Sequence, residues 1–228
     1  MNLKRIRMFS NLVTGTVVLA ICAMLVLSPA VTAENEETDE ASPLEIVREN
    51  TEKVLEIIRD PEIEGENADE KRLERTREAI EPVFDWRRMG QSALGRHWRE
   101  RTDEERTEFA ELFRKLLERT YWKRIRDNAE AEINYKDEDV DEEEGRAKVR
   151  LVAVASGEEE VPISYRLYRL SEEEMKEKKD APVWLVYDVR VEGVSLIKNY
   201  RDQFNDVMVG GSFERLMKML RKKVEENQ

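Results

Sequence analysis

Three segments of alternating apolar and polar residues lie close together in the second half of the chain. They run from Ala147 to Ala155, from Val161 to Arg169 and from Val183 to Val191. Alternation with a period of two is typical of β-strands that have one face in the core. No helix-forming crossover lies between them, and a parallel sheet requires one. The pattern therefore predicts an antiparallel sheet, with Glu132 to Lys136 as a fourth strand.

Apolar residues at helical spacing predict helices before and after these strands. One helix is predicted from Pro43, a short one around residues 73–80, and the strongest from Thr102 to Tyr121. Thr102-Asp103-Glu104-Glu105 forms a capping box at the start of the strongest helix. Two more helices are predicted over residues 196–207 and from residue 212, with two glycines as a helix stop between them. The predicted fold is α+β, with helices packed over the antiparallel sheet and acidic loops at 137–145 and 171–180.

The first 33 residues have the organisation of a secretory signal peptide. A basic patch precedes an apolar stretch, and Val31 and Ala33 fit the −3 and −1 positions of a cleavage site. We expect cleavage near Ala33, an acidic linker over 34–42, a folded domain over 43–228, and export. An uncleaved membrane anchor is an alternative, because about 20 apolar residues suffice to span a bilayer. Lipidation at Cys22 fits less well, because Ile21 is larger than the small residue expected before a lipidated cysteine.

Charge and residue counts exclude several classes of function. The formal net charge of −12 predicts an acidic exterior that disfavours nucleic acid and anionic membrane surfaces. His97 is the single histidine, and Cys22 is the single cysteine, which the predicted cleavage removes. Zinc sites built from His and Cys and Cys–His nucleophiles are thereby excluded. No glycine-rich phosphate loop or dinucleotide fingerprint is present, so we expect no cofactor, no metal site and no catalytic residue.

Two carboxylates stand apart from the solvated acidic runs. Asp85 and Asp188 are each flanked by large apolar residues. We interpret Asp188 as part of a buried or edge ion pair with Arg166 or Arg190. The alternative is general-base chemistry in an enzyme that acts on an apolar substrate on a cone-shaped α+β fold. His97, beside Trp98, is interpreted as a packed or capping residue.

Several motifs together resemble one known family. Leu94-Gly95-Arg96-His97-Trp98 is similar to its Leu-Gly-x-x-Trp segment, and the most specific likeness runs from Trp184 to Leu196 and on into Asn199–Phe204. The family is that of the Mla-type periplasmic phospholipid-binding proteins (MlaC-like, toluene tolerance), and the resemblance extends from Pro43 to Lys222. It implies a nuclear-transport-factor-like fold with an apolar cavity between sheet and helices. It also implies a periplasmic carrier, not an enzyme, that transfers phospholipid between an inner-membrane ABC transporter complex and an outer-membrane lipoprotein complex.

The resemblance makes the apolar stripe of the long helix and the apolar face of the sheet the candidate cavity walls. We expect a monomer, and Tyr121, Tyr165 and Tyr187 suit the cavity mouth because each combines an apolar ring with a polar tip. The sheet face is expected to collect every second residue of the strands, including Leu185 and Tyr187. The predicted lipid-binding residues are Phe109, Phe113, Leu116, Leu117, Tyr121, Leu151, Val161, Ile163, Tyr165, Leu167, Leu185, Tyr187, Val189, Leu196, Tyr200 and Phe204.

Overall fold

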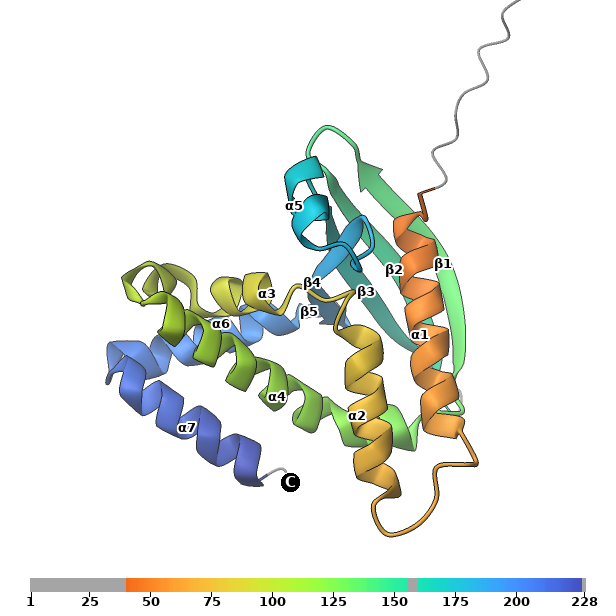
Figure 1. Cartoon of the computed structure of the whole chain (residues 1–228), viewed down its shortest axis with the longest axis horizontal. Helices are drawn as coiled ribbons and strands as arrows, with labels where there is room; N and C mark the ends of the chain where they lie inside the picture. The colour runs from red at the N-terminus through yellow and green to blue at the C-terminus, as the bar shows by residue number, and fades with distance from the viewer. Residues whose placement is uncertain (1–39, 156–159, 227–228) are drawn as a thin grey trace, which may run out of the picture. The chain divides into compact units, whose positions relative to one another are not determined.

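The computed structural model describes residues 40–155 and 160–226, which belong to one compact unit, Asp39–Gln228 (Figure 1). The predicted signal peptide and most of the predicted acidic linker lie outside the described residues. The described elements are α1 (Pro43–Arg59), α2 (Ala68–Ile80), α3 (Trp86–Leu94), the 3-10 helix η1 (Gly95–Glu100), α4 (Asp103–Asp127), β1 (Glu132–Asp141), β2 (Arg146–Val154), β3 (Glu160–Arg169), α5 (Glu172–Glu177), β4 (Trp184–Val191), β5 (Val194–Ser195), α6 (Leu196–Val209) and α7 (Phe213–Glu226).

The five strands form one antiparallel sheet in the order β1-β2-β3-β4-β5. Its register places Val149 opposite Tyr165, and Tyr165 opposite Val189. Residues directly opposite one another across strands share a face. The predicted α+β class and the antiparallel sheet are confirmed.

A β-bulge in β4 divides its apolar residues between the two faces of the sheet. The register shifts between Arg166 and Leu167 of β3, so that Leu167 lies opposite Val186 instead of Tyr187. Leu185 and Tyr187 consequently pack with Tyr168 and Leu170 and not with Leu167. The prediction that they share a face with Leu167 and Tyr165 is therefore wrong, because strict alternation does not continue through a bulge.

The acidic loops contain more regular structure than the sequence pattern predicts. Strand β1 continues to Asp141, with Asp139 opposite Lys148 and Asp137 opposite Arg150. Opposite charges across neighbouring strands stabilise this pairing. The second acidic run contains α5, which begins with a capping box between Ser171 and Glu174. Helix α3 was also not predicted; Asp85 begins it by accepting a hydrogen bond from the amide of Arg88 at 2.8 Å.

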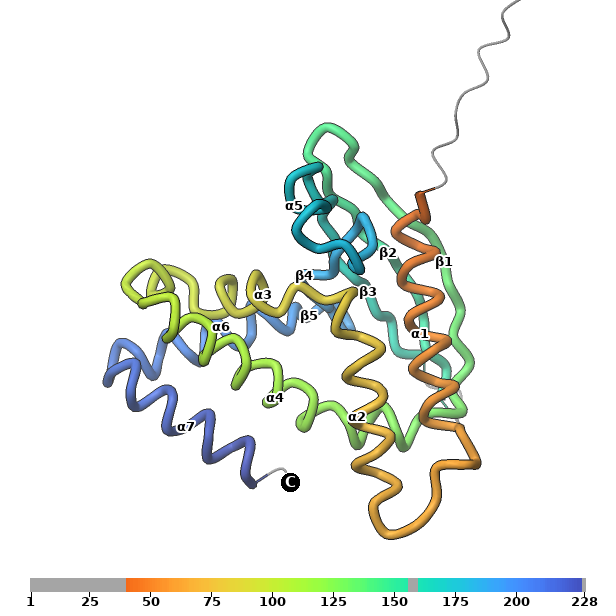
Figure 2. The backbone as a smooth tube through the Cα atoms, in the orientation of Figure 1, coloured from red at the N-terminus to blue at the C-terminus, as the bar shows by residue number. Residues whose placement is uncertain are grey.

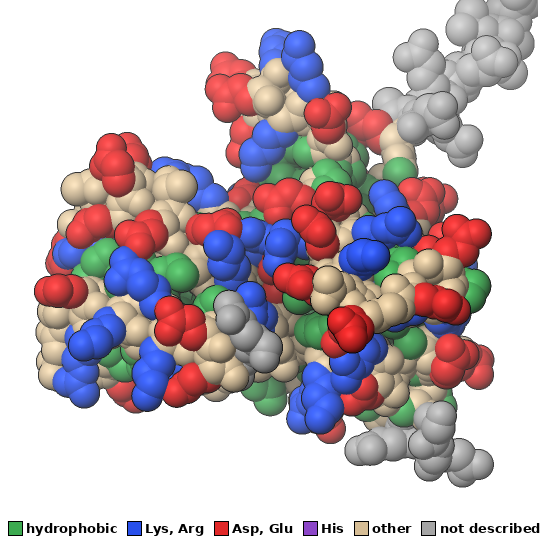
Figure 3. All heavy atoms as spheres, turned by 60° about the horizontal axis from the view of Figure 1, so that its bottom comes forward, with side chains coloured by type: hydrophobic (Ala, Val, Ile, Leu, Met, Phe, Trp, Pro, Cys, Tyr) green, Lys and Arg blue, Asp and Glu red, His purple; other side chains and the backbone are tan. Residues whose placement is uncertain are grey.

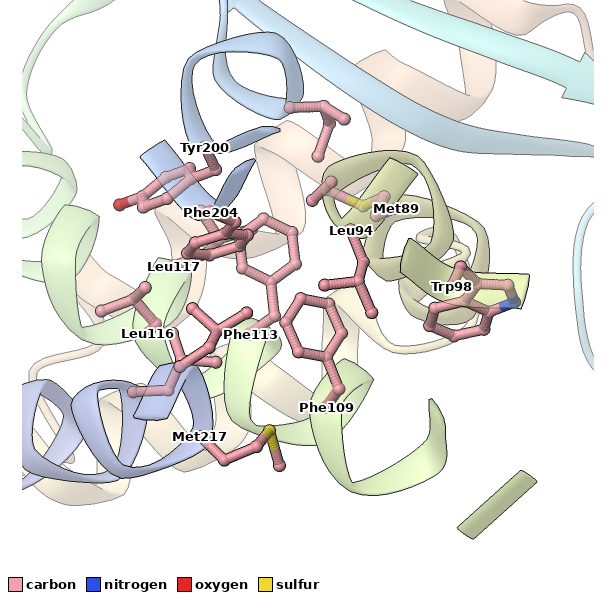
Figure 4. Close-up of a cluster of buried hydrophobic side chains, with 14 of the residues drawn as sticks. Met89, Leu94, Trp98, Phe109, Phe113, Leu116, Leu117, Tyr200, Phe204 and Met217 are labelled. Atoms are coloured by element: carbon pink, nitrogen blue, oxygen red, sulfur yellow. The ribbon is translucent and has the colours of Figure 1, made fainter. Parts of the chain in front are cut away.

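The apolar side chains gather in two main clusters. Helix α1 runs along the sheet (Figure 2). Its Ile46 and Val47 pack with Val149 and Leu167. Helices α3, α4, α6 and α7 form the other cluster, which contains Phe109 and Phe204 (Figure 4). Acidic and basic side chains are interspersed on the face shown in Figure 3. The net charge had suggested a uniformly acidic exterior, and this face does not have one.

Candidate functional site

The face of the sheet that α1 covers is buried at one end and partly accessible at the other. At the buried end, Val149 and Leu167 are 0 % exposed and Val186 is 1 % exposed. Three neighbouring rows of the sheet also carry partly exposed apolar residues, beside Val149 and Leu151, which are buried. We call these residues the open half-face: Ile133, Ala153, Val161, Ile163, Tyr165, Val189 and Val191. Partly exposed apolar residues gathered on one surface are typical of a binding site.

Three hydroxyl groups meet where the covered half of this face borders the open half. The side chain of Thr51 of α1 lies beside those of Tyr135 of β1 and Tyr165 of β3. The Thr51 hydroxyl donates to the carbonyl oxygen of Val47 at 2.7 Å, and the Tyr135 hydroxyl donates to the carbonyl oxygen of Arg48 at 3.4 Å. Burial raises the pKa of both tyrosine hydroxyls, which therefore stay neutral and available for hydrogen bonding. This small polar group lies within an otherwise apolar face.

The helical cluster contains six of the predicted lipid-binding residues, and they form a filled core. Phe109 and Phe113 are 0 % exposed, and the Phe113 ring lies 5.3 Å from Tyr200 and 5.5 Å from Phe204 between centroids (Figure 4). Such edge-to-face contacts are a favourable aromatic packing geometry. Leu116 and Leu117 belong to the same cluster, and Tyr121 packs against it. Burial raises the pKa of the Tyr121 hydroxyl, which lies beside the side chain of Tyr200.

The structure thus divides the predicted lipid-binding residues among several places. Val161, Ile163, Tyr165 and Val189 lie together on the open half-face. Leu151 and Leu167 lie on the same face but are buried, and Leu196 is half-buried at the start of α6. Leu185 and Tyr187 lie on the other face, so the three tyrosines predicted for the cavity mouth do not come together. Ligand contact by these residues stays a prediction.

Both aspartates flanked by apolar residues accept hydrogen bonds at the start of a helix. Asp188 is 4 % exposed and accepts hydrogen bonds from the Ser195 hydroxyl at 2.8 Å and from the amide of Ile197 at 3.3 Å. It therefore stabilises the start of α6, and the expected ion pair with Arg166 or Arg190 is absent from the described residues. Asp85 caps α3 and accepts from the hydroxyl of Tyr168, whose pKa is raised by burial and by this bond.

His97 and two open hollows in the surface lie outside the open half-face. His97 Nε2 lies 3.4 Å from the side chain of Asn205 and 3.4 Å from that of Arg96, without a hydroxyl partner in the described structure. A hollow of about 420 Å³ is lined mainly by charged residues, Arg88 and Glu142–Arg146 among them, and one of about 400 Å³ lies between α1 and residues 179–182. Neither hollow includes the open half-face.

Within residues 40–155 and 160–226, no group of three or more His, Cys, Asp or Glu side chains is placed to hold a metal ion. No helix in these ranges has the length and apolar character needed to cross a membrane.

The fold and the open half-face define an α+β protein in which helices cover one face of an antiparallel sheet and leave part of it accessible. The chain belongs to the MlaC protein family, whose model matches residues 48–222. It is also similar to the phospholipid-binding protein from Ralstonia solanacearum, solved in complex with a phospholipid, with a TM-score of 0.67 and 25 % identity over 82 % of this chain and 99 % of that one. The comparison with functionally curated proteins gives no match.

The open half-face was not evident as such from the sequence. The alternation identified Val161, Ile163 and Tyr165 as apolar strand residues but could not separate them from buried Leu167. Tyr135 and Thr51 were missed altogether. Tyr135 lies in a predicted strand whose alternation is interrupted, between Tyr135 and Asp137, and Thr51 is a polar residue in the middle of a helix.

Proposed function

We propose that this protein is a periplasmic phospholipid carrier, exported with the help of its N-terminal 33 residues. The protein carries phospholipid between an inner-membrane ABC transporter complex and an outer-membrane lipoprotein complex. The observation that carries the proposal is an apolar sheet face left half-open in a member of the MlaC family. The phospholipid in the similar Ralstonia solanacearum structure supports the choice of ligand.

The physical requirement for such a carrier is a dry apolar surface for the acyl chains. Each buried methylene is worth about 0.8 kcal/mol, so two chains of about 15 methylenes cost roughly 20 kcal/mol or more to expose to water. The open half-face supplies apolar side chains from four neighbouring strands. The aromatic core of α3, α4, α6 and α7 is a separate cluster that is already filled, because its rings are packed against one another.

Native mass spectrometry of protein purified from an exporting host tests the lipid. We expect one or two phospholipid molecules per chain, and the mass of the mature chain also tests cleavage after Ala33. Ile163→Asp, on the open half-face, is expected to remove most of the bound lipid, because a carboxylate is poorly solvated beside acyl chains. Val152→Asp is the matched control, since Val152 is also partly exposed and lies opposite Pro162 on the other face of the same strand pair.

A wild-type protein that is consistently empty would overturn the proposal. An activity toward an apolar substrate that is lost in Asp188→Asn would instead favour the alternative of an enzyme. Crosslinking in cells, followed by separation of inner and outer membranes, tests the two partners. The expected products are one protein from each membrane.

A further inference from the structure

The face of the sheet that points away from α1 carries basic side chains on its three central strands. Side chains alternate along a strand, and residues directly opposite one another share a face. The register therefore places Lys148 of β2 and Arg166 of β3 side by side, and it places Arg150 and Arg190 on the two sides of Ser164. We call five residues of this face, in a chain of net charge −12, the basic face: Arg146, Lys148, Arg150, Arg166 and Arg190.

The basic face is accessible from solvent. Helix α1 packs on the opposite side of the sheet, and α5 packs at one end of the face, where Tyr168 and Leu185 lie. Arg166 is exposed, and Lys148 and Arg190 are partly exposed. A binding partner can therefore reach these side chains without any movement of a helix.

Two of the five cations are paired with carboxylates and three are not. Arg146 pairs with Glu144 at 3.4 Å, and Arg150 pairs with Asp137. In the part of the chain that the structure describes, the three others take part in no salt bridge: Lys148, Arg166 and Arg190.

The nearest acids leave the donors of these three cations unused. Asp139 of the edge strand lies opposite Lys148 but forms no ion pair with it. Asp188 lies opposite Arg166, but its carboxylate is buried and accepts hydrogen bonds at the start of α6. The Nε atom of Arg190 is buried and has no hydrogen-bond partner among the described residues. The two acids reduce the local positive charge, but the N–H groups of the cations remain available to a ligand.

The register also brings two like charges into direct opposition. Lys148 and Arg166 are neighbours across β2 and β3, and like charges in such a pair destabilise a sheet. A local arrangement that costs stability is typical of a functional surface. An anionic group that binds between the two side chains would remove the repulsion.

We propose that the basic face is a docking surface for an acidic segment of a partner protein. Carboxylates of the segment bind Lys148, Arg166 and Arg190. This inference goes beyond the proposed function, because it concerns the side of the sheet opposite the open half-face and does not depend on bound lipid.

The surroundings of the basic face favour a protein segment over a membrane surface. Asp137, Asp139 and Asp141 form an acidic border on the edge strand β1. A flat anionic membrane would meet this border together with the cations, whereas a narrow segment contacts the central strands alone. Strands lie about 4.8 Å apart, so three of them present a strip about 10 Å wide, which is the width of one helix. Exposed Pro162 and partly exposed Val152 share this side of the sheet and supply the apolar contacts that accompany arginine in protein interfaces.

Fluorescence anisotropy with a labelled peptide of alternating glutamate and alanine tests the docking surface. The control probe is the same peptide with glutamine in place of glutamate. We expect wild-type protein to bind the glutamate peptide in preference, and we expect salt to weaken this binding. Arg166→Gln and Lys148→Gln should each weaken it about tenfold, since each removes one charge-assisted hydrogen bond. Lys123→Gln and Lys218→Gln, at exposed positions of α4 and α7, make the same change of charge elsewhere and should leave the binding unchanged.

Unfolding in urea provides a second measurement on the same variants. Because Arg166→Gln removes one of two opposed like charges, its urea midpoint should lie above that of wild type while its peptide binding falls. A lower midpoint together with weaker binding would overturn the proposal, since the arginine would then serve the fold.

The outcomes separate the docking surface from the carrier function. If wild type binds both peptides equally, or if Arg166→Gln binds as tightly as Lys218→Gln, the docking surface is overturned. Binding to phosphatidylglycerol vesicles instead of the peptide, lost in Arg166→Gln, would assign the face to a membrane and overturn the proposal. Self-association of wild type that is lost in Arg166→Gln would assign the face to a second copy of the chain, with the same consequence. Native mass spectrometry should find the same bound lipid in Arg166→Gln as in wild type, because the lipid is proposed for the other side of the sheet.

Discussion

Gly95 shows how one residue in the family-like motif is fixed by backbone geometry. Its φ of 59° and ψ of −131° place it where side-chain-bearing residues are strained. An added Cβ would meet Arg201 Cδ at 3.6 Å, which is an ordinary contact. Gly95→Ala is therefore expected to lower the free energy of unfolding by about 1–3 kcal/mol through backbone strain alone. Urea unfolding measures this loss of free energy, with Gln91→Ala, at an exposed position of α3, as the control. Equal stability of the two variants would contradict backbone strain as the cause.

Asp188 is a second residue whose role the structure redefines. Its buried carboxylate holds Ser195 and the first turn of α6, so Asp188→Ala leaves the amide of Ile197 without its acceptor. We expect a loss of about 2 kcal/mol in unfolding free energy, since a buried donor without a partner costs about 1–3 kcal/mol. Asp188→Asn keeps one acceptor oxygen and should lose less. Thermal unfolding of the two variants measures this order, and the reverse order would exclude the capping role.

Helix α2 buries few side chains and is also linked to α4 by ion pairs. Only Thr76 and Ala79 of α2 are buried, whereas Arg77 pairs with Glu118 of α4 at 3.1 Å and Asp69 pairs with Arg126. The side chain of Glu118 is 4 % exposed and also pairs with Arg114. Glu118→Gln removes one partner of a buried network, so we expect a loss of about 3 kcal/mol. Asp69→Asn breaks a half-exposed pair and should cost less than about 1 kcal/mol. Chemical denaturation compares the free energies of unfolding of the two variants. Similar losses would show that burial does not decide how much each ion pair stabilises the protein.

The elements also show why the sequence predicts the fold better than the site. Helix α4 and the core of each strand follow from periodicity, because the apolar residues must reach one side at regular spacing. Helix α3 is short, and its start depends on the Asp85 cap, so the pattern did not reveal it. The bulge beside Tyr187 reverses the facing of Leu185 without changing the composition of β4. Whether an apolar residue such as Ile163 is covered or open depends on where α1 crosses the sheet, which is a long-range property.

At the scale of the whole molecule, an open apolar face couples lipid binding to stability. A ligand that binds the folded state and not the unfolded state stabilises it by about 2.7 kcal/mol at a hundred times its Kd. For a domain of this size, each kcal/mol raises the Tm by about 2–4 °C, so delipidated protein should unfold about 5–10 °C below the loaded form. Calorimetry before and after incubation with phospholipid vesicles measures the shift. Ile163→Asp should have the same Tm before and after incubation with vesicles, whereas Val152→Asp should retain the increase in Tm. A shift of equal size in both variants would mean that lipid binds away from the open half-face.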